Sequence, residues 1–177
     1  MNDTQTKLRK TSRTIAVFLS IGKISSIVGI VLAGAGLVCG LIGRPDIQGW
    51  FMGVEKYAQA PGADVLLPMM IVATMAALLV AAALCHLLEQ VFRGIGEDGT
   101  PFNPAHVSCI KRVAWLALAL SVMVSVADNL EAALLTGERL VLLELDMAAL
   151  LFAAIIYCLA YVFEYGCKLQ QESDETL

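Results

Sequence analysis

The sequence predicts an all-α fold: a four-transmembrane-helix antiparallel bundle with both termini in the cytoplasm (N-in/C-in). Composition supports this prediction, since 58% of the 177 residues are hydrophobic and only 16% are charged, whereas soluble domains average about 25% charged residues. Four apolar stretches are long enough to cross the hydrocarbon core of a bilayer as helices. The distribution of Lys and Arg between the connections then gives the orientation.

We expect the four helices at about 24–42, 65–88, 113–135 and 140–163. Residues 1–23 form a basic segment before the first span, residues 89–112 a cytoplasmic elbow, and residues 164–177 an acidic tail. The first apolar stretch follows basic residues, as the core of a signal peptide would. It is long and lacks an A-x-A cleavage site, however, so we expect a retained anchor.

The orientation follows from the basic residues, because cytoplasmic connections carry an excess of Lys and Arg. Nine of the twelve lie on the side that we assign to the cytoplasm: Lys7, Arg9, Lys10, Arg13, Lys23, Arg93, Lys111, Arg112 and Lys168. The other side holds only Arg44, Lys56 and Arg139. Lys23 lies at the edge of the first span, where we expect its ammonium group to extend to the lipid headgroups. A buried functional lysine is the alternative.

The outer connection, residues 43–64, contains Trp50, Phe51 and Tyr57. Aromatic residues at this depth commonly anchor a protein at the membrane surface. A short interfacial helix over 47–58 is therefore expected, and a ligand-binding loop is the alternative.

Small residues recur at helical spacing in three of the spans. They allow helices to approach closely in lipid, where no hydrophobic force drives helices together. These stripes predict close packing of the first two spans, and they could equally form a homo-oligomer interface. The residues are Gly29, Ala33, Gly36 and Gly40 in the first span, Ala73, Ala77, Ala81 and Cys85 in the second, and Ala149, Ala153 and Ala160 in the fourth.

Acidic residues gather near the outer ends of the third and fourth spans. Asp128 and Glu131 share a helix face, and Asp146 precedes the fourth apolar stretch. Carboxylate oxygens suit hard cations, so these three residues form a candidate cation site in a small cation-responsive or transport protein. The alternative is a hydrated hairpin tip. No charge lies at the centre of a span, which counts against a transport path.

The elbow has a more distinctive pattern. Glu89 and Arg93 are four residues apart and predict an ion pair that extends the second helix beyond the lipid. Gly94, Gly96 and Gly99 are then expected to end that helix. Asn103 and Pro104 predict the start of the next one, with asparagine as the N-cap, proline at the first helical position and Phe102 packed back as a staple.

Catalytic and metal-binding patterns are missing from the sequence. His86 and His106 could meet at the inner surface, although a histidine at a helix end is more often a surface residue. The five cysteines form no C-x-x-C pair, and we expect free thiols with no metal or cofactor. No nucleophile, base and orienting group can be assembled, so we do not expect an enzyme. The net charge of −4 argues against direct binding of nucleic acid.

Two segments together resemble a known family. One is Gly99-Thr-Pro-Phe102, followed by Ile110, Arg112 and Val113. The other is the C-terminal pattern G-x-x-L-x-x-E-x-D-x-T-hydrophobic, here Gly166, Leu169, Glu172, Asp174, Thr176 and Leu177. Both are similar to small bacterial membrane proteins of the domain of unknown function 2975. The acidic residues of the outer hairpin are not part of that pattern.

The resemblance implies four membrane helices in the bacterial cytoplasmic membrane and no established catalytic activity. Members are often encoded beside a small helix-turn-helix regulator of the Cro type, which implies a protein that regulates or tethers such a regulator. The candidate docking residues are Gly99, Pro101, Phe102, Gly166, Leu169, Glu172 and Asp174. The acidic tail could engage a basic DNA-binding face; a frayed, solvated helix end is the alternative.

Overall fold

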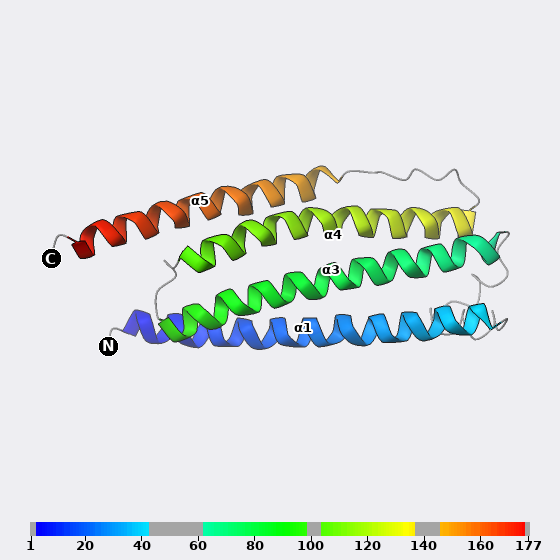
Figure 1. Cartoon of the computed structure of the whole chain (residues 1–177), viewed down its shortest axis with the longest axis horizontal. Helices are drawn as coiled ribbons and strands as arrows, with labels where there is room; N and C mark the ends of the chain where they lie inside the picture. Colours follow the sequence, from blue (N-terminus) through cyan, green and yellow to red (C-terminus); the bar gives the residue numbers. More distant parts are fainter. Residues whose placement is uncertain (1–2, 43–61, 99–103, 137–145, 176–177) are drawn as a thin grey trace. The chain divides into compact units, whose positions relative to one another are not determined.

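The computed structural model describes the chain except for residues 1–2, 43–61, 99–103, 137–145 and 176–177. The described part consists of four helices without strands: α1 (Asp3–Leu41), α3 (Ala63–Asp98), α4 (Pro104–Thr136) and α5 (Met147–Glu175) (Figure 1). All four are long and apolar enough to cross a membrane. The prediction of an all-α protein with four transmembrane helices is therefore confirmed.

The helices extend well beyond the predicted spans. α1 begins at Asp3 rather than near residue 24, and α5 continues past residue 163 to Glu175. The prediction that Gly94 and Gly96 end the second helix is wrong, because α3 runs through both to Asp98. α4 begins at Pro104, as the proline predicts. Residues 99–103 of the predicted elbow and residues 140–145 at the predicted start of the fourth span lie outside the described part.

The chain divides into two compact units. Unit 1 comprises Met1–Lys23, Ala82–Leu118 and Met147–Leu177, and unit 2 comprises Ile24–Ala81 and Ala119–Asp146. Both ends of the chain therefore belong to unit 1.

In unit 2, α1 and α3 pack as an antiparallel pair through small residues. A Cβ atom at Gly29 would lie 3.0 Å from Leu78, and one at Gly34 would lie 3.7 Å from Met75. Ala33 and Ala77 are buried. The predicted contact between the first two spans is confirmed, because these small residues let the two helices approach closely. The core of this unit is formed by Ala33, Leu67, Met70, Ile71, Leu130 and Leu134.

In unit 1, glycine again marks the closest approach of two helices. A Cβ atom at Gly94 of α3 would collide with the imidazole of His106 near the start of α4. Glycine continues a helix at a cost of only about 1 kcal/mol relative to alanine, so it is tolerated here and makes room for the ring. The small-residue stripe of α5 is also buried, at Ala153 and Ala160.

Large apolar side chains cover much of the described surface. In the most apolar part of each helix, no more than 22% of the residues are buried inside the protein. Exposed large apolar side chains include Val17, Phe18, Ile21, Leu79, Leu151, Phe152 and Val162. A soluble protein does not expose apolar surface on this scale, whereas lipid tails accept it, so these faces fit a bilayer.

Candidate functional site

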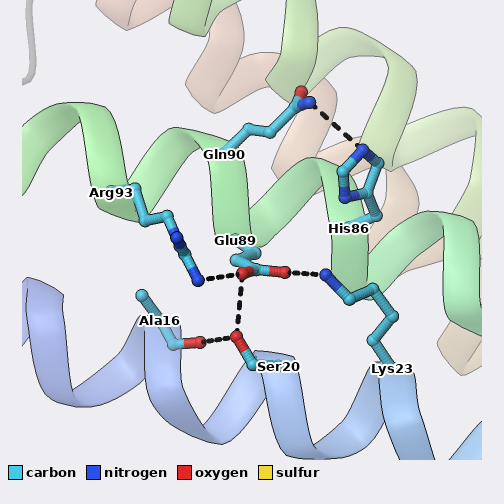
Figure 2. Close-up of polar contacts among 7 residues, drawn as sticks. All are labelled: Ala16, Ser20, Lys23, His86, Glu89, Gln90 and Arg93. Atoms are coloured by element: carbon cyan, nitrogen blue, oxygen red, sulfur yellow. Dashed lines mark hydrogen bonds and ion pairs between the residues drawn. The ribbon is translucent and has the colours of Figure 1, made fainter.

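A buried carboxylate links α1 to α3 in unit 1. Only 7% of the Glu89 side chain is exposed, and it lies against Lys23 and Ser20 of α1 and Arg93 of its own helix (Figure 2). The Lys23 ammonium group pairs with Oε2, and an Arg93 guanidinium nitrogen lies 2.6 Å from Oε1. The Ser20 hydroxyl lies 2.8 Å from Oε1 and 3.0 Å from the Ala16 carbonyl oxygen, so its proton can serve either acceptor.

Local helix geometry explains how these side chains meet. Ser20 and Lys23 are three residues apart on α1, and Glu89 and Arg93 are four apart on α3, so each pair shares one helix face. A charge taken out of water needs partners to offset its lost hydration. Glu89 has two cations and a hydroxyl. The arrangement therefore satisfies the carboxylate fully and leaves a local excess of positive charge.

The structure confirms one sequence expectation at this cluster and corrects another. The predicted ion pair between Glu89 and Arg93 is present. The expectation that Lys23 extends to the headgroups is wrong, because its ammonium group turns to Glu89 and its side chain is only 28% exposed. Ser20 was missed. One signal was available: Lys23 and Glu89 both lie at the ends of apolar stretches, on the side assigned to the cytoplasm.

A second ion pair joins α4 to α5 in unit 1. The Lys111 ammonium group donates to Glu164 Oε2 at 2.8 Å and lies 4.7 Å from the centre of the Tyr161 ring. Tyr157 makes edge-to-face contacts with both Trp115 and Tyr161, at centroid distances of 6.4 and 5.5 Å. Such ring geometry is favourable beyond the area that it buries. These contacts hold the start of α4 against the later part of α5, antiparallel to it.

A groove of about 650 Å³ lies beside this ion pair. Its lining combines charged groups, amides and small side chains from α4 and α5: Pro104, Val107, Ser108, Lys111, Glu164, Cys167, Lys168, Gln170, Gln171 and Glu175. Both signs of charge and several hydrogen-bonding groups are present. The groove is therefore suited to a polar, structured partner rather than to a purely apolar molecule.

The predicted docking residues are only partly described. Gly99, Pro101 and Phe102 lie outside the described residues. Gly166 is half-buried on α5, whereas Leu169 and Glu172 are exposed on the same helix. Asp174 belongs to α5, but its side chain is outside the described part. Leu169 lies between two residues that line the groove, Lys168 and Gln170, so the tail borders the groove.

The predicted cation site is not assembled in the described part of the chain. Asp128 and Asp146 are exposed and Glu131 is half-buried. Among the described residues, no three His, Cys, Asp or Glu side chains gather closely enough to hold a metal ion.

The two histidines have separate surroundings. His86 lies 3.2 Å from the Gln90 side-chain nitrogen on α3, and His106 is buried against Gly94. The two histidines, which the sequence allowed to meet, therefore make separate contacts.

Among the comparisons with known proteins, only a match to a sequence profile was found. No curated protein and no solved structure matches the chain. The sequence profile of the family described as "Protein of unknown function (DUF2975)" matches residues 51–177. The match includes α3, α4 and α5, and with them Glu89, Arg93 and the whole groove. Because it covers more than half of the chain, the resemblance in the elbow and tail is confirmed: this membrane protein belongs to the DUF2975 family.

Proposed function

We propose that this protein is a non-enzymatic docking protein of the bacterial cytoplasmic membrane that tethers a helix-turn-helix regulator through the groove between α4 and α5. The observation that carries this proposal is the groove itself. It lies where α4 and α5 continue as helices past the apolar spans expected at 113–135 and 140–163. Helices that project from the lipid offer a fixed surface to a soluble partner.

Charge and connectivity support a cytoplasmic location for both ends of the chain. Nine of the twelve Lys and Arg residues lie on the side of the chain ends, and the first and last segments belong to the same compact unit. The positive-inside rule assigns that side to the cytoplasm. A cytoplasmic regulator would therefore meet the groove directly.

The chemistry of the groove favours a basic, helical partner. Glu164 and Glu175 line it, and Glu172 is exposed on the same helix. Lys111 pairs with Glu164, and Glu172 and Glu175 add two further carboxylates at the end of α5, close to the exposed Leu169. DNA-binding domains carry a basic face, and such a face complements this surface. Occupation of that face by the tail would keep the regulator from DNA.

Two matched tryptophan variants test the proposal. Ser108→Trp places a large ring in the groove, whereas Val162→Trp adds the same ring to a lipid-facing, exposed position on α5. Any helix-turn-helix regulator encoded beside the gene is purified, and its binding to the full chain in detergent is measured by interferometry. A third variant lacks residues 169–177.

The wild type and Val162→Trp are expected to bind the regulator with the same Kd. Ser108→Trp and the truncated chain are expected to lose at least about tenfold in affinity, equivalent to about 1.4 kcal/mol. Absence of binding by the wild type, or equal binding by Ser108→Trp and Val162→Trp, would reject the groove as the docking site.

A further inference from the structure

A small pocket of about 220 Å³ opens between the first part of α1 and the last part of α3, within unit 1. It is lined by Arg13, Ala16, Val17, Phe92, Arg93, Gly96 and Glu97. A neighbouring hollow of about 490 Å³ shares Arg13 and Val17 and adds the basic residues Arg9 and Lys10. Guanidinium groups and apolar side chains therefore meet at one place on the protein.

The charge at this place is positive. Among the described lining residues, Glu97 alone carries a carboxylate. Arg9 donates to the backbone oxygen of Glu97 at 3.4 Å, which draws the basic end of α1 to the pocket. Arg93 contacts Glu89 through one nitrogen. A guanidinium group has five N–H donors, and the Arg93 side chain is 62% exposed, so it can bind an anion while it keeps the ion pair.

An apolar path leads from this basic end along α1. Arg13, Val17 and Ile21 follow each other at intervals of four residues, so they share one helix face. Val17 and Ile21 are both more than half exposed, at 56% and 57%. A molecule with its anionic group at Arg13 would place any attached hydrocarbon chain over these two residues. Soluble anions lack such a chain, whereas phospholipids have it.

We propose that this pocket binds the phosphate group of an anionic phospholipid in the leaflet on the N-terminal side of α1. The phosphate accepts hydrogen bonds from Arg13 and Arg93, while an acyl chain lies over Val17 and Ile21. The small residues Ala16 and Gly96 leave room for the headgroup. Basic pockets between membrane helices on the cytoplasmic side bind anionic headgroups in this way. The assignment is independent of the α4–α5 groove.

The experiment uses the full chain in dodecyl maltoside and two matched variants. Arg13→Gln removes a pocket charge, and Arg112→Gln removes an exposed charge of α4 that does not line the pocket. Dioleoyl phosphatidylglycerol, dioleoyl phosphatidylcholine and inorganic phosphate are titrated separately, with binding followed by native mass spectrometry and by Tm. Because Arg13 is exposed, both variants should have the wild-type Tm before lipid is added.

Phosphatidylglycerol is expected to bind the wild type and Arg112→Gln equally and to raise their Tm, and phosphatidylcholine to do neither at the same concentration. Arg13→Gln should weaken phosphatidylglycerol binding about tenfold, the loss of one charge-assisted contact. Equal affinity of Arg13→Gln and Arg112→Gln for phosphatidylglycerol would overturn the proposal. So would equal binding of phosphatidylcholine. A Tm increase produced by inorganic phosphate alone would make free phosphate the ligand and overturn the assignment to a lipid.

Discussion

Glu89 and Lys23 form an ion pair between α3 and α1, although 66 residues separate them in the sequence. The Glu89 side chain is almost buried, at 7% exposure. An unpaired charge at such a position would be costly. The match to the family profile covers residues 51–177 and does not include α1. The pair therefore connects α1 to the part of the chain that the profile matches.

The first prediction concerns this pair. Lys23→Met should lower Tm, because it leaves the buried Glu89 with Arg93 as its remaining cation. Lys111→Met should lower Tm less, since both Lys111 and Glu164 are more exposed than Glu89, at 32% and 40%. Lys23→Arg keeps a cation beside Glu89, so its Tm should lie close to that of the wild type. Thermal unfolding in detergent gives the ranking, and a larger loss in Lys111→Met than in Lys23→Met would contradict it.

The second prediction concerns the approach of α3 to α4. Gly94→Ala should destabilise the protein by about 1–3 kcal/mol, the usual cost of overpacking, because the added methyl group collides with His106. Gly34→Ala is the control, since its Cβ would meet only Met75 at an ordinary 3.7 Å. Adding His106→Ala to Gly94→Ala should recover part of the loss, and strict additivity of the two substitutions would argue against the contact.

The third prediction concerns the core of unit 2. Ile71 has no exposed surface and packs among Leu67, Leu130 and Leu134. Ile71→Ala should lower the free energy of unfolding by about 2 kcal/mol, the low end for such truncations. The loss is small because lipid also offers the side chain an apolar environment once the helices have separated. Val72→Ala, at a position 55% exposed, should have little effect. Chemical unfolding in mixed micelles compares the two, and equal losses would place Ile71 on the lipid face.

The fourth prediction addresses the acidic residues. Because the described part of the chain does not gather them into one site, Asp128→Asn combined with Asp146→Asn should leave the response of Tm to Ca²⁺ and Mg²⁺ unchanged. The same pair should leave ion flux into liposomes at the background level. A wild-type Tm increase with either ion that the double variant loses would revive the hypothesis of a cation-responsive protein.

Periodicity and charge were sufficient to predict the four helices, because lipid accepts only long, internally hydrogen-bonded apolar segments. The start of α4 was also predicted, since Pro104 has no backbone N–H to lose at a first helical position. The small residues of α1 and α3 indicated their contact, since Gly29 and Ala33 leave room for a neighbour. These features are local properties of one segment or of one helix face.

The candidate site was less predictable because it depends on pairs that are distant in sequence. Glu89 was paired correctly with Arg93 on its own helix, whereas the placement of Lys23 and Glu89 at the ends of two apolar stretches indicated only that they could meet, not that Lys23 turns to Glu89. Gly94 and Gly96 were interpreted as helix breakers, whereas Gly94 makes room for His106. Glycine lowers helix propensity only slightly, and close packing outweighs that cost. The α4–α5 groove also depends on the continuation of α5 past residue 163 to Glu175, which no apolar pattern indicates.

The most direct test of the account is a topology map of the full chain in intact cells. Single cysteines at Thr6, Gln48, Thr136 and Ser173 are introduced into a cysteine-free background and exposed to a membrane-impermeant maleimide. Four crossings with both ends in the cytoplasm predict labelling at Gln48→Cys and Thr136→Cys, and protection at Thr6→Cys and Ser173→Cys until the cells are lysed. Labelling of either chain end in intact cells, with Gln48→Cys protected, would contradict the account.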